Sequence, residues 1–165
     1  MHIIKTYIYF AEPQYIYIMS KTLIICHIVF CTKFREKSIN PEYDRDLYAF
    51  ICQIFKENKC WVHRINGASD HIHILLNLNP TIALADLMRE VKASSSQWLK
   101  KNPDFRFFRG WGKGYFAVSV NPDNIEHVKQ YIINQKDHHR SGGFEKEIEF
   151  LINHFGLDWF PDEWN

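Results

Sequence analysis

Hydrophobic residues follow two different spacings along this chain, and the spacing changes at turn-forming residues. Residues 23–32 form a nearly unbroken apolar run with β-branched members, which predicts a central strand. Residues 60–66 and 70–76 also favour strands, and the short turn at residues 67–69 predicts that these two form a hairpin. The pattern at residues 115–120 predicts a fourth strand.

Between and after these strands, apolar side chains recur at helical spacing. This spacing, together with Pro, Asn and Gly at the expected boundaries, predicts helices over 41–58, from a cap at 79–81 to about 101, over 122–139 and over 144–155. The order β-α-β-β-α-β-α is typical of an α+β sandwich of the ferredoxin-like or RNA-recognition-like type. We therefore predict an antiparallel sheet with helices on one face.

Length and composition agree with one folded domain. The chain has 165 residues, of which 46% are apolar and 24% are charged, as in globular proteins. Residues 1–20 are rich in tyrosine and isoleucine and contain a second methionine near their end, so we predict an N-terminal extension at 1–20 and a single domain at 21–165. We find no secretory signal, no CxxC pair and no apolar stretch of about 18–20 residues, which favours a reduced, cytoplasmic location without a membrane span.

Charge is distributed unevenly although the formal net charge is only +1. Residues 88–113 contain seven basic residues and two acidic ones, whereas residues 141–165 contain six acidic residues and one lysine. A basic region of this kind suits an anionic partner, although ordinary solvated charge explains it equally well. Because of its negative charge, we expect the acidic tail helix to serve packing or dimerisation and not to contact such a partner.

The first candidate for chemistry is the pair His71 and His73. In a strand, alternate side chains share a face, so the two imidazoles point one way while Ile72 and Ile74 point toward a core. Side chains two residues apart on one face lie roughly 7 Å from each other at their roots, so both rings can reach one metal ion. The alternative is a hydrogen-bonded pair of surface histidines with no metal.

The second candidate lies on the helix predicted after the fourth strand. Tyr131 and Gln135 are one helical turn apart and share a face. A tyrosine phenol can attack phosphorus and hold a covalent intermediate, and a metal beside it can polarise the phosphate. The amide oxygen of Gln135 could supply a third metal ligand. Packing is the alternative role for Tyr131, because aromatic residues at helical spacing usually pack.

Taken together, these motifs make the chain resemble the HUH single-tyrosine transposases of the smallest bacterial insertion sequences (transposase A type), and especially the REP-associated tyrosine transposases. The resemblance spans roughly residues 21–156. It is carried by the segment His27-Ile28-Val29-Phe30-Cys31-Thr32-Lys33, the triplet His71-Ile72-His73, residues 111–116, and the segment Tyr131-Ile132-Ile133-Asn134-Gln135 followed by His138-His139.

The resemblance implies a fold of the HUH endonuclease type and an enzyme that cuts and rejoins single-stranded DNA. Tyr131 would attack a DNA phosphate and form a 5′-phosphotyrosine, and His71, His73 and Gln135 would bind a divalent metal, Mg or Mn. We expect manganese to serve at least as well as magnesium, because imidazole suits it better. The resemblance also implies recognition of DNA hairpins by a homodimer, in which the tyrosine helix of one subunit often serves the other.

Other residues in the sequence suit contact with DNA. Basic residues interleaved with aromatic ones can contact the backbone and stack on bases, and we predict this role for Lys33, Arg35, Arg89, Lys92, Trp98, Trp111 and Lys113. We expect structural roles for His27, His63, His127 and His138, although each could also orient a metal ligand.

Two other functions fit the same residues. One is a catalytically silent module that binds hairpins, and the other is a metal-dependent hydrolase that acts through water. A Tyr131→Phe substitution separates the three possibilities, because only the transposase forms a covalent DNA adduct through this residue.

Overall fold

The computed structural model describes residues 21–135 and 144–158. The N-terminal extension predicted at residues 1–20 and the motif residues His138 and His139 lie outside the described residues. Among the described residues, no helix is both long and apolar enough to cross a membrane.

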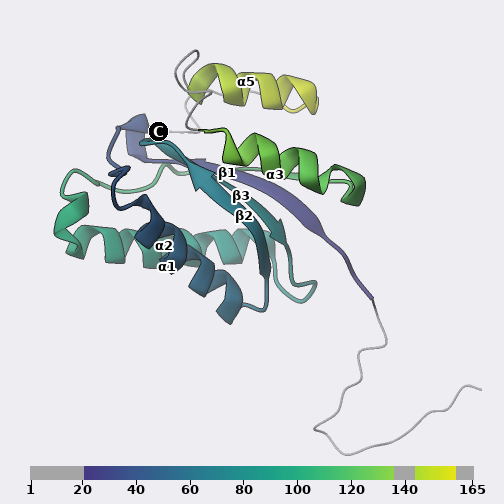
Figure 1. Cartoon of the computed structure of the whole chain (residues 1–165), viewed down its shortest axis with the longest axis horizontal. Helices are drawn as coiled ribbons and strands as arrows, with labels where there is room; N and C mark the ends of the chain where they lie inside the picture. The colour runs from purple at the N-terminus through teal and green to yellow at the C-terminus, as the bar shows by residue number, and fades with distance from the viewer. Residues whose placement is uncertain (1–20, 136–143, 159–165) are drawn as a thin grey trace, which may run out of the picture.

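A four-stranded antiparallel sheet forms the centre of the molecule (Figure 1). Its strands are β1 (Ile25–Cys31), β2 (Trp61–Gly67), β3 (His71–Asn77) and β4 (Phe116–Ser119), in the order β2-β3-β1-β4. All three pairings are antiparallel. The predicted α+β fold, including the β2–β3 hairpin, is therefore confirmed.

Helices cover both faces of this sheet (Figure 1). One face carries α1 (Asp44–Glu57) and α2 (Leu84–Lys101), and the other carries α3 (Ile125–Ile133) and α5 (Phe144–His154). The prediction of helices on one face needs correction, because it holds only for α1 and α2. The apolar run of β1 explains the difference, since a strand with apolar side chains on both sides requires a cover on both.

The main core lies between the sheet and the α1–α2 layer. Alternate residues of β1 and β3 point into it, and helix residues fill the space beneath them: Ile28, Phe30, Ile72, Ile74, Leu76, Leu47, Ile51, Phe55, Leu87 and Val91. Each fully buried aliphatic or aromatic side chain contributes about 1.5–3 kcal/mol relative to an exposed one. On the opposite face, α5 and α3 bury smaller apolar clusters, which leaves room there for polar residues.

Short turns fix the start of β3 against the end of β1. The backbone N–H of Thr32 donates to the carbonyl of Asp70 at 2.8 Å, and the Thr32 hydroxyl donates to the same oxygen at 3.2 Å. Within the hairpin, the N–H of Ala68 donates to the carbonyl of His71 at 3.0 Å. Gly67 packs so tightly here that a Cβ atom would collide with that carbonyl oxygen and lie 2.9 Å from the Cα of Ile72.

We predict that Gly67→Ala destabilises the protein by about 1–3 kcal/mol, because backbone atoms cannot move aside as cheaply as a flexible side chain. Denaturant unfolding followed by circular dichroism measures this change. The control is Gln97→Ala, an exposed position on α2, which should change the free energy of unfolding by less than about 0.5 kcal/mol. Equal stability of Gly67→Ala and the wild type would contradict the tight packing.

Candidate active site

His71 and His73 lie on the same face of β3, as strand alternation predicted, and their ring centroids are 5.0 Å apart. Both side chains are fully buried, under the layer formed by α3 and α5. Ile72 and Ile74 point to the opposite face and belong to the main core. Because side chains alternate along a strand, four consecutive residues place a polar centre on one face of the sheet and apolar core residues on the other.

The Nδ1 atoms of both histidines have hydrogen-bonding partners. Nδ1 of His71 lies 2.6 Å from Oδ1 of Asp70, and Nδ1 of His73 lies 3.0 Å from Nε2 of His27. Burial lowers the pKa of His27 to about 4, so its ring is neutral and can accept a hydrogen bond. When each Nδ1 carries the proton and donates it, Nε2 presents its lone pair to a metal.

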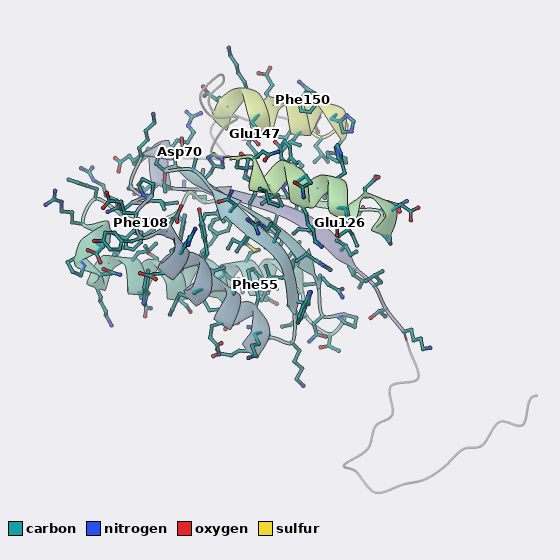
Figure 2. The ribbon with its side chains drawn as sticks, viewed as in Figure 1. Phe55, Asp70, Phe108, Glu126, Glu147 and Phe150 are labelled. Carbon is teal, nitrogen blue, oxygen red and sulfur yellow. The ribbon has the colours of Figure 1, made fainter. Side chains whose placement is uncertain are left out.

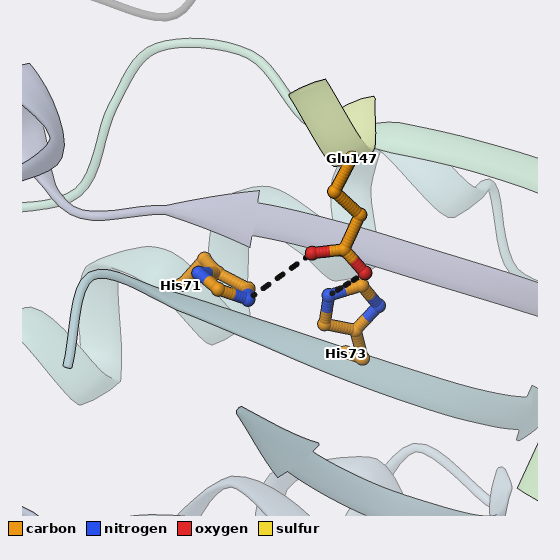
Figure 3. A group of neighbouring side chains, drawn as sticks. All are labelled: His71, His73 and Glu147. Atoms are coloured by element: carbon orange, nitrogen blue, oxygen red, sulfur yellow. Dashed lines mark ion pairs between the residues drawn. The ribbon is translucent and has the colours of Figure 1, made fainter. Parts of the chain in front are cut away.

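A carboxylate from the tail helix lies against the two Nε2 atoms (Figure 3). Oε2 of Glu147 is 3.8 Å from Nε2 of His71, and Oε1 is 3.4 Å from Nε2 of His73. Figure 2 shows Glu147 on the side of α5 that faces the sheet, with Phe150 on the outer side. The Glu147 side chain keeps only 13% of its surface exposed.

Glu147 was not among the residues predicted for the site, because we expected the acidic tail helix to serve packing or dimerisation. Packing is indeed one of its roles: Ile148, Leu151 and Ile152 of α5 bury against Val29 and neighbouring sheet residues. One signal was available in the sequence. Glu147 lies one turn before Leu151, and residues four apart share a helix face, so this carboxylate borders the apolar stripe that docks.

Tyr131 of α3 reaches the same centre. Its hydroxyl donates a hydrogen bond to Oε1 of Glu147, and its ring centroid lies 5.9 Å from that of His73. Burial raises the pKa of Tyr131 above its usual value, and the negative charge of Glu147 raises it further. The side chain of Asn66 on β2 fixes the end of this helix, because it donates to the carbonyls of Ile132 and Ile133 at 2.9 and 3.1 Å.

Gln135 follows α3 and is fully buried beside Tyr131. Its Nε2 donates to Oε1 of Glu147 at 2.7 Å, so its amide group faces the carboxylate. The structure thus brings together all four residues predicted for catalysis and metal binding, within a single chain. All four side chains lie against the carboxylate of Glu147.

This group of side chains has the donor set of a metal site. One ligand atom from each of His71, His73 and Glu147 lies within 4.8 Å of the others. Two imidazoles and one carboxylate suit divalent cations of intermediate hardness, such as Mn²⁺ or Fe²⁺. Nitrogen ligands make the site less suited to Mg²⁺, which prefers oxygen.

A basic groove lies on the other face of the sheet, between α2 and the loop that precedes β4. Its volume is about 620 Å³. Five of the seven residues predicted to contact DNA line this groove, together with Arg109: Lys33, Arg89, Lys92, Trp111 and Lys113. The groove lies at the end of the sheet where Cys31 of β1 pairs with His71, because the N–H of the nearby Lys33 donates to the carbonyl of Gly110 at 2.8 Å.

Two of the groove residues also fix the loop to α2. Nζ of Lys92 donates to the carbonyls of Lys113 and Gly114 at 2.9 and 2.8 Å, and burial lowers its pKa. Nε1 of Trp111 donates to Oγ of Ser95 at 2.9 Å. These contacts hold the loop in place, so the groove is a preformed surface.

Arg35 and Trp98 do not line this groove. Arg35 forms an ion pair with Glu145 of α5. Trp98 stacks on Phe50 of α1, with ring centroids 5.2 Å apart, and packs near Phe105. Both side chains therefore join elements of the fold, a role that their residue types alone did not reveal.

Comparison with known proteins places the chain among transposases. Residues 20–135 match the family model described as "Transposase IS200 like". The transposase of insertion sequence element IS200 from Salmonella typhimurium is 26% identical over 121 residues, which cover 70% of this chain and 79% of the relative. The ISDra2 transposase TnpA of Deinococcus radiodurans is 25% identical over 116 residues, which cover 67% of this chain and 83% of the relative.

A solved structure supports the fold independently. The REP-associated tyrosine transposase bound to a REP hairpin superposes with a TM-score of 0.57 at 12% identity, covering 88% of this chain and 89% of that one. These findings confirm the resemblance that the motifs indicated. Since the family model matches well over half of the chain, the protein belongs to the IS200-like transposase family and is a DNA-cleaving and rejoining enzyme.

Proposed function

We propose that this transposase cuts and rejoins single-stranded DNA through a covalent bond between Tyr131 and a 5′ phosphate, with a divalent metal held at His71 and His73. One observation carries the proposal: the phenol of Tyr131 and both imidazoles surround the same carboxylate in a buried centre. A nucleophile suited to phosphorus and a cation site suited to phosphate oxygens thus occupy one location.

The family resemblance adds Gln135 to the metal ligands, with Mg or Mn as the ion. The two imidazoles favour Mn over Mg. When bound, the metal supplies polarisation of the scissile phosphate and neutralises its developing charge. The hydrogen bonds at Nδ1 of His71 and His73 would leave each Nε2 available to hold the cation.

In the proposed cleavage step, the phenol oxygen of Tyr131 forms a bond to phosphorus as the bond from phosphorus to the 3′ oxygen breaks. The phenol loses its proton and the departing 3′ oxygen gains one, which leaves a free 3′ hydroxyl and a 5′-phosphotyrosine. Rejoining is the reverse attack by a 3′ hydroxyl on that linkage. Because the ordinary pKa of a tyrosine is about 10, the phenol has to lose its proton during the attack.

The basic groove is the proposed binding surface for DNA. Arg89, Arg109 and Lys113 supply positive charge along it, and cations of this kind bind phosphates irrespective of sequence. A structural neighbour was solved with a REP hairpin, so we propose a hairpin as the DNA partner here. A DNA strand bound in the groove would pass around the end of β1 to reach the histidines on the other face of the sheet.

We further propose a cytoplasmic homodimer, as the family resemblance implies, with residues 21–165 as its domain. The described chain assembles Tyr131, His71 and His73 within one subunit, so a dimer could use the tyrosine of the same subunit. Both imidazoles are fully buried, so the side chains that cover them have to move before a phosphodiester can reach the site.

Tyr131→Phe should lower formation of the covalent DNA adduct by about 10⁴-fold or more, because the variant lacks the attacking oxygen. Its affinity for a hairpin should stay within twofold of the wild type. The assay mixes protein, labelled single-stranded hairpin DNA and Mn²⁺, and a denaturing gel detects a shifted, protease-sensitive band. The control is Tyr43→Phe, a partly exposed tyrosine away from the site. An adduct that survives in Tyr131→Phe would contradict the proposal.

Lys113→Ala should weaken hairpin binding and reduce the slope of log affinity against log salt by about 0.7–0.9, as expected for one lost phosphate contact. Fluorescence anisotropy at several salt concentrations measures both quantities. Lys100→Ala removes an exposed charge outside the groove and should leave the slope unchanged. Equal slopes for the two variants would place the DNA elsewhere.

A further inference from the structure

We propose that Glu147 of the tail helix α5 is a ligand of the metal, so that His71, His73 and Glu147 form the protein's own ligand set. In this arrangement Gln135 is a positioning residue that holds the carboxylate. The inference rests on the proposed metal site, and it changes which residue completes that site.

The geometry around Glu147 carries the inference. Its two oxygens divide between the histidines, with Oε1 at 3.4 Å from Nε2 of His73 and Oε2 at 3.8 Å from Nε2 of His71 (Figure 3). Two ligand atoms of one ion, each bonded at about 2.0–2.2 Å, lie about 3–4 Å apart. Both carboxylate–imidazole separations fall in this range, and one ligand atom from each of the three residues lies within 4.8 Å of the others.

The contacts of Gln135 and Tyr131 support this assignment. Both donate to Oε1 of Glu147, the amide from 2.7 Å and the phenol from its hydroxyl. Hydrogen bonds from neighbouring side chains orient a ligand carboxylate and are typical of metal sites. A carboxylate also carries the negative charge that a buried cation needs, which the neutral amide of Gln135 cannot provide.

The packing of α5 explains how the carboxylate reaches the sheet. Ile148, Leu151 and Ile152 bury against the sheet, and Glu145 pairs with Arg35 at the first turn of the helix. Glu147 lies between these anchors and is held facing β3 (Figure 2). This helix lies beyond the segment that matches the family model, which ends at residue 135.

A ligand on α5 couples two equilibria. If the cation binds Glu147 only when α5 is docked, then metal binding stabilises the docked helix and docking raises the metal affinity by the same factor. The site on the sheet and the tail of the chain would then form one thermodynamic unit.

Mn²⁺ titration of the full-length protein, followed by calorimetry and by the electron paramagnetic resonance of free Mn²⁺, tests the ligand directly. Glu147→Gln should weaken Mn²⁺ binding by about 10–100-fold, since it removes the charge and keeps the shape. Glu147→Asp should keep more affinity than Glu147→Gln. The matched control is Glu149→Gln, which removes an exposed carboxylate from the same helix and should bind Mn²⁺ as the wild type does.

A second measurement uses the wild type, so it does not depend on whether a Glu147 variant folds. In the wild type, Mn²⁺ should slow hydrogen exchange of the backbone amides in residues 145–152, because the ion ties α5 to β3. Exchange in α5 that is unaffected by bound Mn²⁺ would overturn the inference.

The outcomes separate this inference from the function on which it rests. If Glu147→Gln binds Mn²⁺ as tightly as the wild type while His73→Ala loses binding, Glu147 is not a ligand and the proposed metal site stands. If the wild type binds no Mn²⁺, both the ligand assignment and the proposed metal site are wrong. If the Tyr131→Phe variant still forms the DNA adduct, the proposed covalent role of Tyr131 is wrong and the ligand assignment is unaffected.

Discussion

The alternation of side chains along β3 is the constraint on which the rest of the molecule depends. Odd and even positions of one short strand perform different tasks: Ile72, Ile74 and Leu76 complete the main core, whereas His71 and His73 face the opposite layer. A shift of one residue in register would bury both imidazoles among apolar groups and expose the core residues. The Asp70–Thr32 hydrogen bonds and the close packing at Gly67 hold that register, so the turn that begins β3 matters as much as the strand.

Burial of polar groups then dictates what the second helical layer must supply. Two imidazoles removed from water need partners, because an unsatisfied buried polar group is costly. Asp70 and His27 serve the Nδ1 atoms, and Glu147 faces the Nε2 atoms. The carboxylate is itself held by hydrogen bonds from Tyr131 and Gln135. The contacts that dock α3 and α5 thus also bring the phenol of Tyr131, the amide of Gln135 and the carboxylate of Glu147 to one point.

The end of β1 joins this centre to the basic groove. Thr32 contacts the residue that orients His71, and the next residue, Lys33, contacts the loop that forms the groove wall. Lys92 and Trp111 tie that loop to α2, so the groove and the histidine centre are held by the same strand end although they occupy opposite faces of the sheet.

The sequence by itself determined the order of the main strands and helices and the shared face of His71 and His73, and it predicted that Gln135 lies near Tyr131. These features follow from local periodicity, which a chain carries in its own residues. Only the tertiary structure decided that helices cover both faces, that Arg35 pairs with Glu145 and Trp98 stacks on Phe50, and that Glu147 enters the centre. Each of these depends on a contact between segments far apart in the chain, and local spacing does not specify which distant surface a helix face will meet. An acidic helix can remain at the surface or dock by its apolar stripe. Here it docks, because β1 and β4 present apolar side chains on the face that α1 and α2 leave open.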